Sequence, residues 1–175
     1  MADIRLLDYL SCVPDFPKPG IMFRDISPLI ADTQAFEFAI KQLSLYANQS
    51  EFTHILAIES RGFIFASALA ITMSKPLLLA RKPNKLPSVS HRQSYGLEYV
   101  QDALEIQAQI IPAQAKVLII DDVVATGGTL LAAAELLRQA KIDIVGALSL
   151  LEIADLAGNS RLLKNGISAY SILSV

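Results

Sequence analysis

The chain has 175 residues, the size of one ordinary domain, and 53% of them are hydrophobic, so it can bury a large core. Only 18% are charged, which excludes a disordered chain, and 15 Lys and Arg against 17 Asp and Glu argue against binding nucleic acid or an anionic membrane by bulk charge. Cys12 is alone, so no intramolecular disulfide can form, and no apolar run reaches the roughly 18–20 residues of a bilayer span. We expect a soluble, cytoplasmic protein.

The predicted elements alternate between short buried strands and amphipathic helices. A short N-terminal helix precedes a Pro-rich extended segment at residues 13–20, and apolar residues at helical spacing predict a helix over 35–47. The remaining elements follow in chain order: strands at 54–58, 76–80, 116–120, 144–151 and 167–175, and helices at 62–73 and 129–140.

This alternation predicts an α/β fold with a central, mainly parallel sheet flanked by helices, in one domain spanning residues 1–175. Ligands in such sheets bind beyond the carboxyl ends of the strands. The loops that follow Ile58, Ala80, Ile120 and Leu151 are therefore the places to seek a site.

The sharpest motif follows the strand at 116–120, where two acids and two valines lead into Ala125, Thr126, Gly127, Gly128 and Thr129. The glycines allow the backbone to bend tightly, and the start of the next helix offers unpaired N–H groups and the positive end of its dipole to a phosphate. Neither G-x-x-x-x-G-K-[ST] nor G-x-G-x-x-G is present. An acidic turn before a glycine-rich helix start is the structural alternative.

The adjacent carboxylates of Asp121 and Asp122 would repel a phosphate unless they accept hydrogen bonds from hydroxyls or help to hold a cation. A ligand with both a phosphate and vicinal hydroxyls, namely a phosphorylated ribose, resolves this conflict.

Residues 117–129 resemble the 5-phosphoribosyl-1-pyrophosphate (PRPP) motif of the type I phosphoribosyltransferases. Further segments resemble the adenine-specific members of that family, in the expected order over roughly residues 14–158: Phe16-Pro17-x-Pro19-Gly20, Phe23-Arg24-Asp25-Ile26, Ser60-Arg61-Gly62-Phe63, Arg81-Lys82 with Lys85-Leu86-Pro87, and Leu97-Glu98-Tyr99 before Leu104-Glu105-Ile106. The resemblance implies a small N-terminal hood at about 1–33 and a flexible catalytic loop at about 82–102.

The resemblance also implies a reaction, in which the phosphoribosyl group of PRPP passes to N9 of adenine and gives AMP and pyrophosphate. Mg²⁺ would be held mainly by PRPP and pyrophosphate oxygens, with no protein ligand assigned. The phosphate would lie on residues 125–129, and the ribose hydroxyls on Asp121 and Asp122. Pyrophosphate would be bound by Ser60, Arg61, Arg81, Lys82 and Lys85.

The hood would read the adenine edge through the backbone of Met22 and Arg24, while Phe23 and Val123 cover its two faces. On the loop, Glu98 would carry the proton traffic and Tyr99 would contact pyrophosphate or the partner of the closed loop, with Arg61 beside the reacting atoms. The family usually has Gly where this chain has Val100, a residue that cannot share glycine conformations. Glu105 is expected to face solvent or a subunit partner.

Two rival functions are open at this point. A phosphoribosyltransferase for a 6-oxopurine would need a donor facing O6, commonly a Lys near the last strand, but no Lys follows Lys164. A regulator that binds purines or PRPP and controls nucleic acid would need a basic face, for which a net charge of −2 leaves little room. By resemblance a homodimer is expected.

Overall fold

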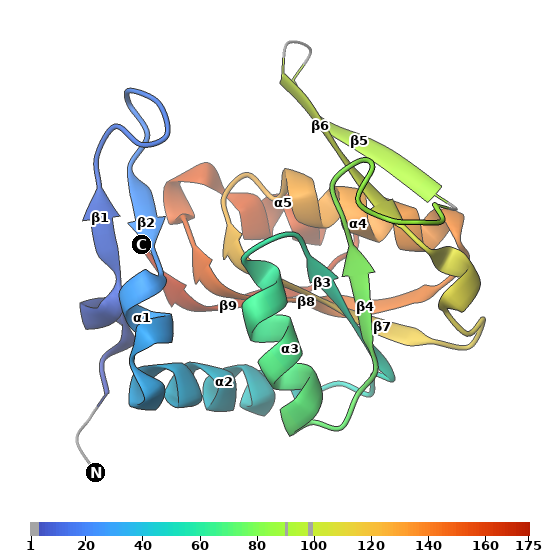
Figure 1. Ribbon diagram of the computed structural model, residues 1–175, viewed down its shortest axis with the longest axis horizontal. Coiled ribbons are helices and arrows are strands. Elements are labelled where there is room, and N and C mark those ends of the chain that lie inside the picture. Colours follow the sequence, from blue (N-terminus) through green and yellow to red (C-terminus); the bar gives the residue numbers. More distant parts are fainter. Residues whose placement is uncertain (1–3, 90, 98–99) are drawn as a thin grey trace. The chain divides into compact units, whose positions relative to one another are not determined.

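The computed structural model describes residues 4–89, 91–97 and 100–175 (Figure 1). The chain forms two compact units, Met1–Gln42 and Leu43–Val175. Helix α2, Thr33–Ala47, begins in the first unit and ends in the second. None of the helices in the described part of the chain is long and apolar enough to cross a membrane.

The first unit is built around a short antiparallel ribbon. Its elements are η1 (Leu6–Tyr9), β1 (Ser11–Val13), β2 (Phe23–Asp25) and α1 (Ser27–Ala31), with β1 paired to β2. The predicted N-terminal helix is present as a 3-10 turn.

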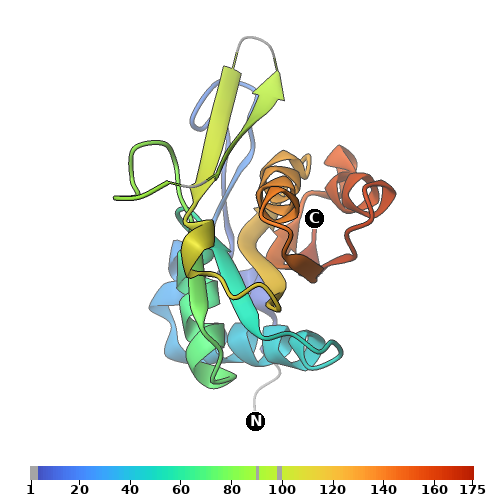
Figure 2. The same ribbon diagram turned by 90° about the vertical axis from the view of Figure 1, so that its right-hand side faces the viewer.

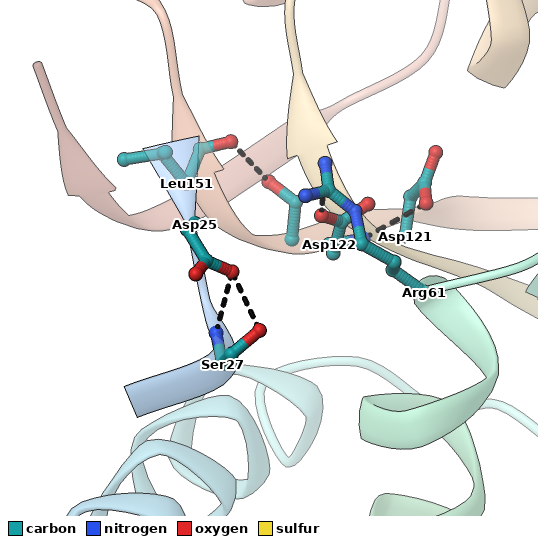
Figure 3. Close-up of polar contacts among 7 residues, drawn as sticks. Asp25, Ser27, Arg61, Asp121, Asp122 and Leu151 are labelled. Atoms are coloured by element: carbon teal, nitrogen blue, oxygen red, sulfur yellow. Dashed lines mark hydrogen bonds and ion pairs between the residues drawn. The ribbon is translucent and has the colours of Figure 1, made fainter. Parts of the chain in front are cut away.

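The Pro-rich segment joins the two strands of this ribbon. Gly20 turns at φ +84° and donates its N–H to Asp15 Oδ1 at 2.7 Å, and the Phe16 and Phe23 rings meet edge to face with centroids 5.0 Å apart. The Asp25 carboxylate accepts the N–H and hydroxyl of Ser27 at 2.9 and 2.6 Å, which fixes the entry to α1 (Figure 3).

The second unit contains the predicted parallel sheet, in the strand order β4-β3-β7-β8-β9. Its strands are β3 (His54–Ile58), β4 (Leu77–Ala80), β7 (Lys116–Val124), β8 (Asp143–Glu152) and β9 (Ala169–Ser174). Their apolar runs are covered on both faces, as in parallel sheets generally, so that Ile119 and Leu150, for example, are fully buried.

Helices cover both faces of this sheet, as the alternation of elements predicts. They are α3 (Gly62–Thr72), α4 (Gly128–Gln139) and α5 (Gly158–Lys164), with 3-10 turns η2 (Ala108–Ile110) and η3 (Ala154–Leu156). α4 and α5 lie together on one side and α3 on the other (Figure 2). The helices at 62–73 and 129–140 are confirmed.

The segment predicted as a flexible loop over 82–102 contains regular structure. β5 (His91–Leu97) and β6 (Val100–Ile106) form an antiparallel hairpin that projects from the sheet (Figure 1). At its base, Arg81 and Glu105 exchange backbone hydrogen bonds of 2.9 and 2.8 Å, which joins it to the end of β4. The backbone N–H and C=O groups of such a long connection need hydrogen-bond partners, and pairing of the two strands supplies them.

Glu105 is buried, at 4% exposure, so the prediction that it faces solvent or a partner subunit is wrong. Its carboxylate accepts the Asn84 N–H at 3.1 Å and lies 3.7 Å from Arg92 Nη1. These contacts compensate the burial of its charge.

Candidate functional site

A pocket of about 370 Å³ lies at the carboxyl ends of β3 and β7, where the fold predicts a ligand. All of its lining residues belong to the second unit: Glu59, Ser60, Arg61, Lys82, Tyr95, Asp102, Asp121, Asp122, Val123, Val124, Ala125, Thr126, Gly127, Gly128, Thr129 and Leu130.

One wall of the pocket is the phosphate loop, which we define as residues 125–129. β7 continues past the two acids to Val124, so the turn is shorter than the sequence suggests. Gly127 adopts φ +76°, a left-handed conformation that favours glycine, and α4 begins at Gly128. The amide groups of the first turn of α4 have no partners within the helix and can bind an anion.

The floor of the pocket is the pair Asp121 and Asp122, which are 7% and 5% exposed. Burial, and next the charge of Asp122, raises the pKa of Asp121 well above its usual range. Burial also raises the pKa of Asp122, although the Arg61 guanidinium opposes the shift. The Asp121 Oδ1 atom accepts the backbone N–H of Asp122 at 2.8 Å.

Arg61 connects the two strand ends. Its Nη2 lies 2.8 Å from Asp122 Oδ2, so the guanidinium reaches from the start of α3 to the floor of the pocket (Figure 3). The contact is an ion pair without hydrogen-bond geometry. Within the described part of the chain, Asp122 Oδ2 is a buried oxygen with no hydrogen-bond donor. The guanidinium compensates part of the cost of burying this charge and leaves the oxygen able to accept a hydrogen bond.

Gly62 allows α3 to approach the acid pair closely. A Cβ on Gly62 would lie 2.9 Å from Asp121 Oδ1, 3.0 Å from its Cα and 3.0 Å from the Ile120 oxygen. We therefore expect Gly62→Ala to lower the free energy of unfolding by about 1–3 kcal/mol, because backbone must shift to admit the methyl group. Urea denaturation measures this change.

Gly128→Ala is the matched control, since Gly128 also begins a helix beside the pocket. Among the described residues, its Cβ would meet Thr126 Oγ1 at 3.6 Å and Tyr95 Cδ2 at 3.8 Å, which are ordinary contacts. A Gly62→Ala protein as stable as the Gly128→Ala protein would contradict the close packing of α3 on the acids.

The residues predicted to bind pyrophosphate divide into two groups. Ser60, Arg61 and Lys82 line the pocket, whereas Arg81 and Lys85 are not among its lining residues. Arg81 donates to Glu59, with Nε 3.0 Å from Oε2, and lies over the Phe63 ring.

Five lining residues were not predicted as site residues from the sequence, and three of them, Glu59, Tyr95 and Asp102, carry polar side chains. Glu59 accepts the Lys82 N–H at 2.7 Å as well as the Arg81 guanidinium, and these contacts, that of Arg81 first, lower the pKa of its carboxyl. The Asp102 carboxylate contacts Lys82 Nζ and accepts the Tyr95 hydroxyl at 3.0 Å. The only sequence signal for Glu59 was its position directly after a buried strand.

The contact with Asp102 competes with the binding of another anion, such as pyrophosphate, to Lys82. Burial alone would lower the pKa of Lys82, but the contact with Asp102 outweighs it, and the pKa is raised. We expect Asp102→Asn to tighten pyrophosphate binding about two- to fivefold, the range of a partly exposed ion pair. Calorimetric titration with pyrophosphate measures this, with Asp143→Asn, at the start of β8, as control. Unchanged or weaker binding would show that Asp102 does not compete for Lys82.

The other predicted site residues are not placed in this pocket by the structure. Met22, Phe23 and Arg24 belong to the first unit, where they lie at or next to β2 and Arg24 Nη1 contacts Cys12 Sγ. Glu98 and Tyr99 lie outside the described residues.

Comparison with known proteins agrees with this fold. A family model described as the phosphoribosyl transferase domain matches residues 29–173. The chain therefore belongs to the phosphoribosyltransferase family. An adenine phosphoribosyltransferase of Polynucleobacter asymbioticus is 60% identical over 170 residues, 97% of this chain and 99% of the relative. Within the family, the chain groups with the adenine phosphoribosyltransferases.

Solved structures lead to the same group. An adenine phosphoribosyltransferase from Thermoanaerobacter pseudethanolicus superimposes with a TM-score of 0.92 at 35% identity, covering 97% of this chain and 98% of that one. The Saccharomyces cerevisiae protein, solved with adenine and D-2,5-dideoxy-2,5-imino-altritol 1,6-bisphosphate, gives a TM-score of 0.88 at 32% identity, covering 95% of each chain.

Proposed function

We propose that the protein transfers the phosphoribosyl group of PRPP to N9 of adenine. The bond between C1′ of the ribose and the pyrophosphate oxygen breaks, the bond from C1′ to N9 forms, and N9 loses its proton. AMP and pyrophosphate are the products. The observation that carries this proposal is one pocket in which a phosphate loop and a buried pair of carboxylates lie side by side.

The phosphate loop and the two acids bind different parts of the phosphoribosyl group. The amides of residues 125–129 and the hydroxyls of Thr126 and Thr129 bind the 5′-phosphate at the start of α4. Asp121 and Asp122 accept hydrogen bonds from the ribose 2′- and 3′-hydroxyls. A ribose hydroxyl would supply the donor that Asp122 Oδ2 lacks, once the Arg61 guanidinium turns toward pyrophosphate.

Positively charged and hydrogen-bonding side chains can stabilise pyrophosphate as it leaves. The transition state places growing negative charge on pyrophosphate, and Ser60, Arg61 and Lys82 at the pocket can stabilise it, with Arg81 and Lys85 further along the same chain segment. Arg61 is paired with Asp122 and Lys82 with Asp102, so binding of pyrophosphate exchanges one anionic partner for another.

Mg²⁺ fits this site as an ion carried by the substrate. Among the described residues, no group of three or more His, Cys, Asp or Glu side chains is arranged to hold a metal. Mg²⁺ often combines few protein carboxylates with substrate phosphates, and it would neutralise charge on the pyrophosphate when bound. The residues of this chain then orient the sugar and the leaving group.

For adenine recognition we propose the hood, with backbone groups of Met22 and Arg24 reading the N6 amino and N1 edge, and Phe23 and Val123 on the ring faces. The relative from S. cerevisiae solved with adenine supports a site for this base in the family. Glu98 acts as general acid or base near N7 and N9, and Tyr99 contacts pyrophosphate. We further propose that the enzyme works as a cytoplasmic homodimer, on the family resemblance.

Calorimetric titration with three nucleosides and nucleotides tests the site. AMP should bind most tightly. 2′,3′-Dideoxy-AMP lacks the hydroxyls that donate to the acids and should bind on the order of tenfold more weakly, and adenosine lacks the phosphate and should bind on the order of 100-fold more weakly. Adenosine binding as tightly as AMP would contradict the role of the phosphate loop, and equal binding of the dideoxy nucleotide would contradict that of the acids.

A further inference from the structure

We propose that α5 is a positioning element for the phosphate loop, and that Gly158 and Arg161 hold the loop in the shape that binds the 5′-phosphate. Neither residue lines the pocket at the two acids, and both approach the backbone of the loop. The inference rests on the proposed function, because it assigns how the phosphate part of that site is shaped.

The packing of Gly158 against the phosphate loop leaves no room for a side chain at Gly158. A Cβ on Gly158 would lie 2.3 Å from the Ala125 oxygen, 2.6 Å from Val124 Cγ1 and 3.1 Å from the Gly127 nitrogen. A Cβ on Gly127 would in turn lie 3.0 Å from the Gly158 oxygen. The start of α5 therefore touches the turn of the phosphate loop directly.

Two side chains of α5 continue this contact. Arg161 Nη1 donates to the Thr126 oxygen at 3.3 Å, and Leu162 is fully buried, with its Cγ 3.4 Å from the Cβ position of Gly127. The Ile153 N–H, just before η3, donates to the Val124 oxygen at 2.9 Å. The segment between β8 and the end of α5 thus donates hydrogen bonds to the backbone oxygen of Val124, directly before the loop, and to that of Thr126 within it.

The loop needs such support because of its own composition. Two glycines and a left-handed turn leave it with more conformational freedom than other residues would, and ordering it at the moment of binding would cost affinity. Ala157, at the start of α5, is itself in the left-handed region at φ +52°, the conformation that delivers Gly158 to the loop. A phosphate then meets amide groups that already point toward it.

Gly158→Ala tests the contact most sharply. We expect the KM for PRPP and the Kd for AMP to rise about tenfold or more, because the new methyl group displaces the loop, while the Kd for pyrophosphate changes less than about twofold. Amide hydrogen exchange of residues 125–129 should become faster. A general loss of packing would weaken both ligands alike.

Gly146→Ala is the matched control. A Cβ there would lie 2.7 Å from the Ser168 oxygen, which is also a forced contact with backbone, although a milder one than at Gly158. Gly146 pairs with Leu118 at the start of β7, about 20 Å along the strand from the loop. It should lower stability and leave the PRPP KM unchanged. Gly158→Ala with the parent's PRPP KM and AMP Kd would overturn the inference.

Arg161→Gln decides the question where Gly158→Ala does not fold. It should weaken AMP binding about threefold and Arg161→Lys less, while Arg138→Gln has no effect, since Arg138 donates to the Asn165 oxygen and not to the loop. Unchanged AMP binding in Arg161→Gln would contradict the role of α5 but not the proposed function. A parent protein that bound no AMP would contradict the proposed function and, with it, the inference.

Discussion

Asp122→Asn should lower kcat/KM for PRPP on the order of 10- to 100-fold while the protein stays folded. The loss is that of one charged hydrogen bond to a ribose hydroxyl. Fold stability should not fall, because burial raises the pKa of Asp122 and the folded state therefore disfavours its charge, a cost that the neutral amide avoids. Steady-state kinetics with varied PRPP, together with urea denaturation, measure both effects.

Asp122→Asn should also affect the binding of pyrophosphate and of AMP differently. Arg61 loses its partner on the floor of the pocket, so pyrophosphate binding should be kept or strengthened while AMP binding weakens. Asp143→Asn, at the start of β8, controls for the loss of one negative charge. Equal PRPP kinetics in Asp122→Asn and the parent would remove Asp122 from the ribose site.

Glu98→Gln should lower kcat about 100-fold or more, the effect expected from loss of a general acid or base. PRPP affinity should stay within about twofold, because the glutamine keeps the size of the side chain and the pocket residues that bind PRPP are untouched. The pH dependence of kcat should lose the limb that belongs to the carboxyl group. Rapid-quench and steady-state measurements over pH 5–9 test this.

Glu51→Gln is the control for Glu98→Gln, since the Glu51 side chain is 96% exposed and its ion pair with Lys116 is 3.7 Å long. A change confined to the KM for adenine in Glu98→Gln would make Glu98 a binding residue, and proton transfer would have to be assigned elsewhere.

The sheet and the phosphate loop could be predicted because their signals are local. Each buried strand is a continuous apolar run, and the acids and glycines follow one another without interruption from Asp121 to Thr129. The family resemblance then supplied roles for residues at the other strand ends.

Contacts between distant segments could not be predicted in this way. Lys82 meets Asp102 only because β5 and β6 form a hairpin, and the sequence analysis predicted a flexible loop there. The approach of Gly158 to Gly127 depends on where α5 returns after β8, which no local pattern encodes. Glu105 was misplaced for the same reason, because its partners Asn84 and Arg92 come from the preceding segment.

The most direct test is to incubate the purified protein with Mg²⁺, PRPP and equal amounts of adenine, hypoxanthine and guanine, and to separate the nucleotides formed. We expect AMP as the dominant product, with one pyrophosphate released for each AMP. IMP or GMP as the main product would contradict the assignment of the hood to adenine, and no nucleotide, with PRPP still bound, would show a binding protein instead of a transferase.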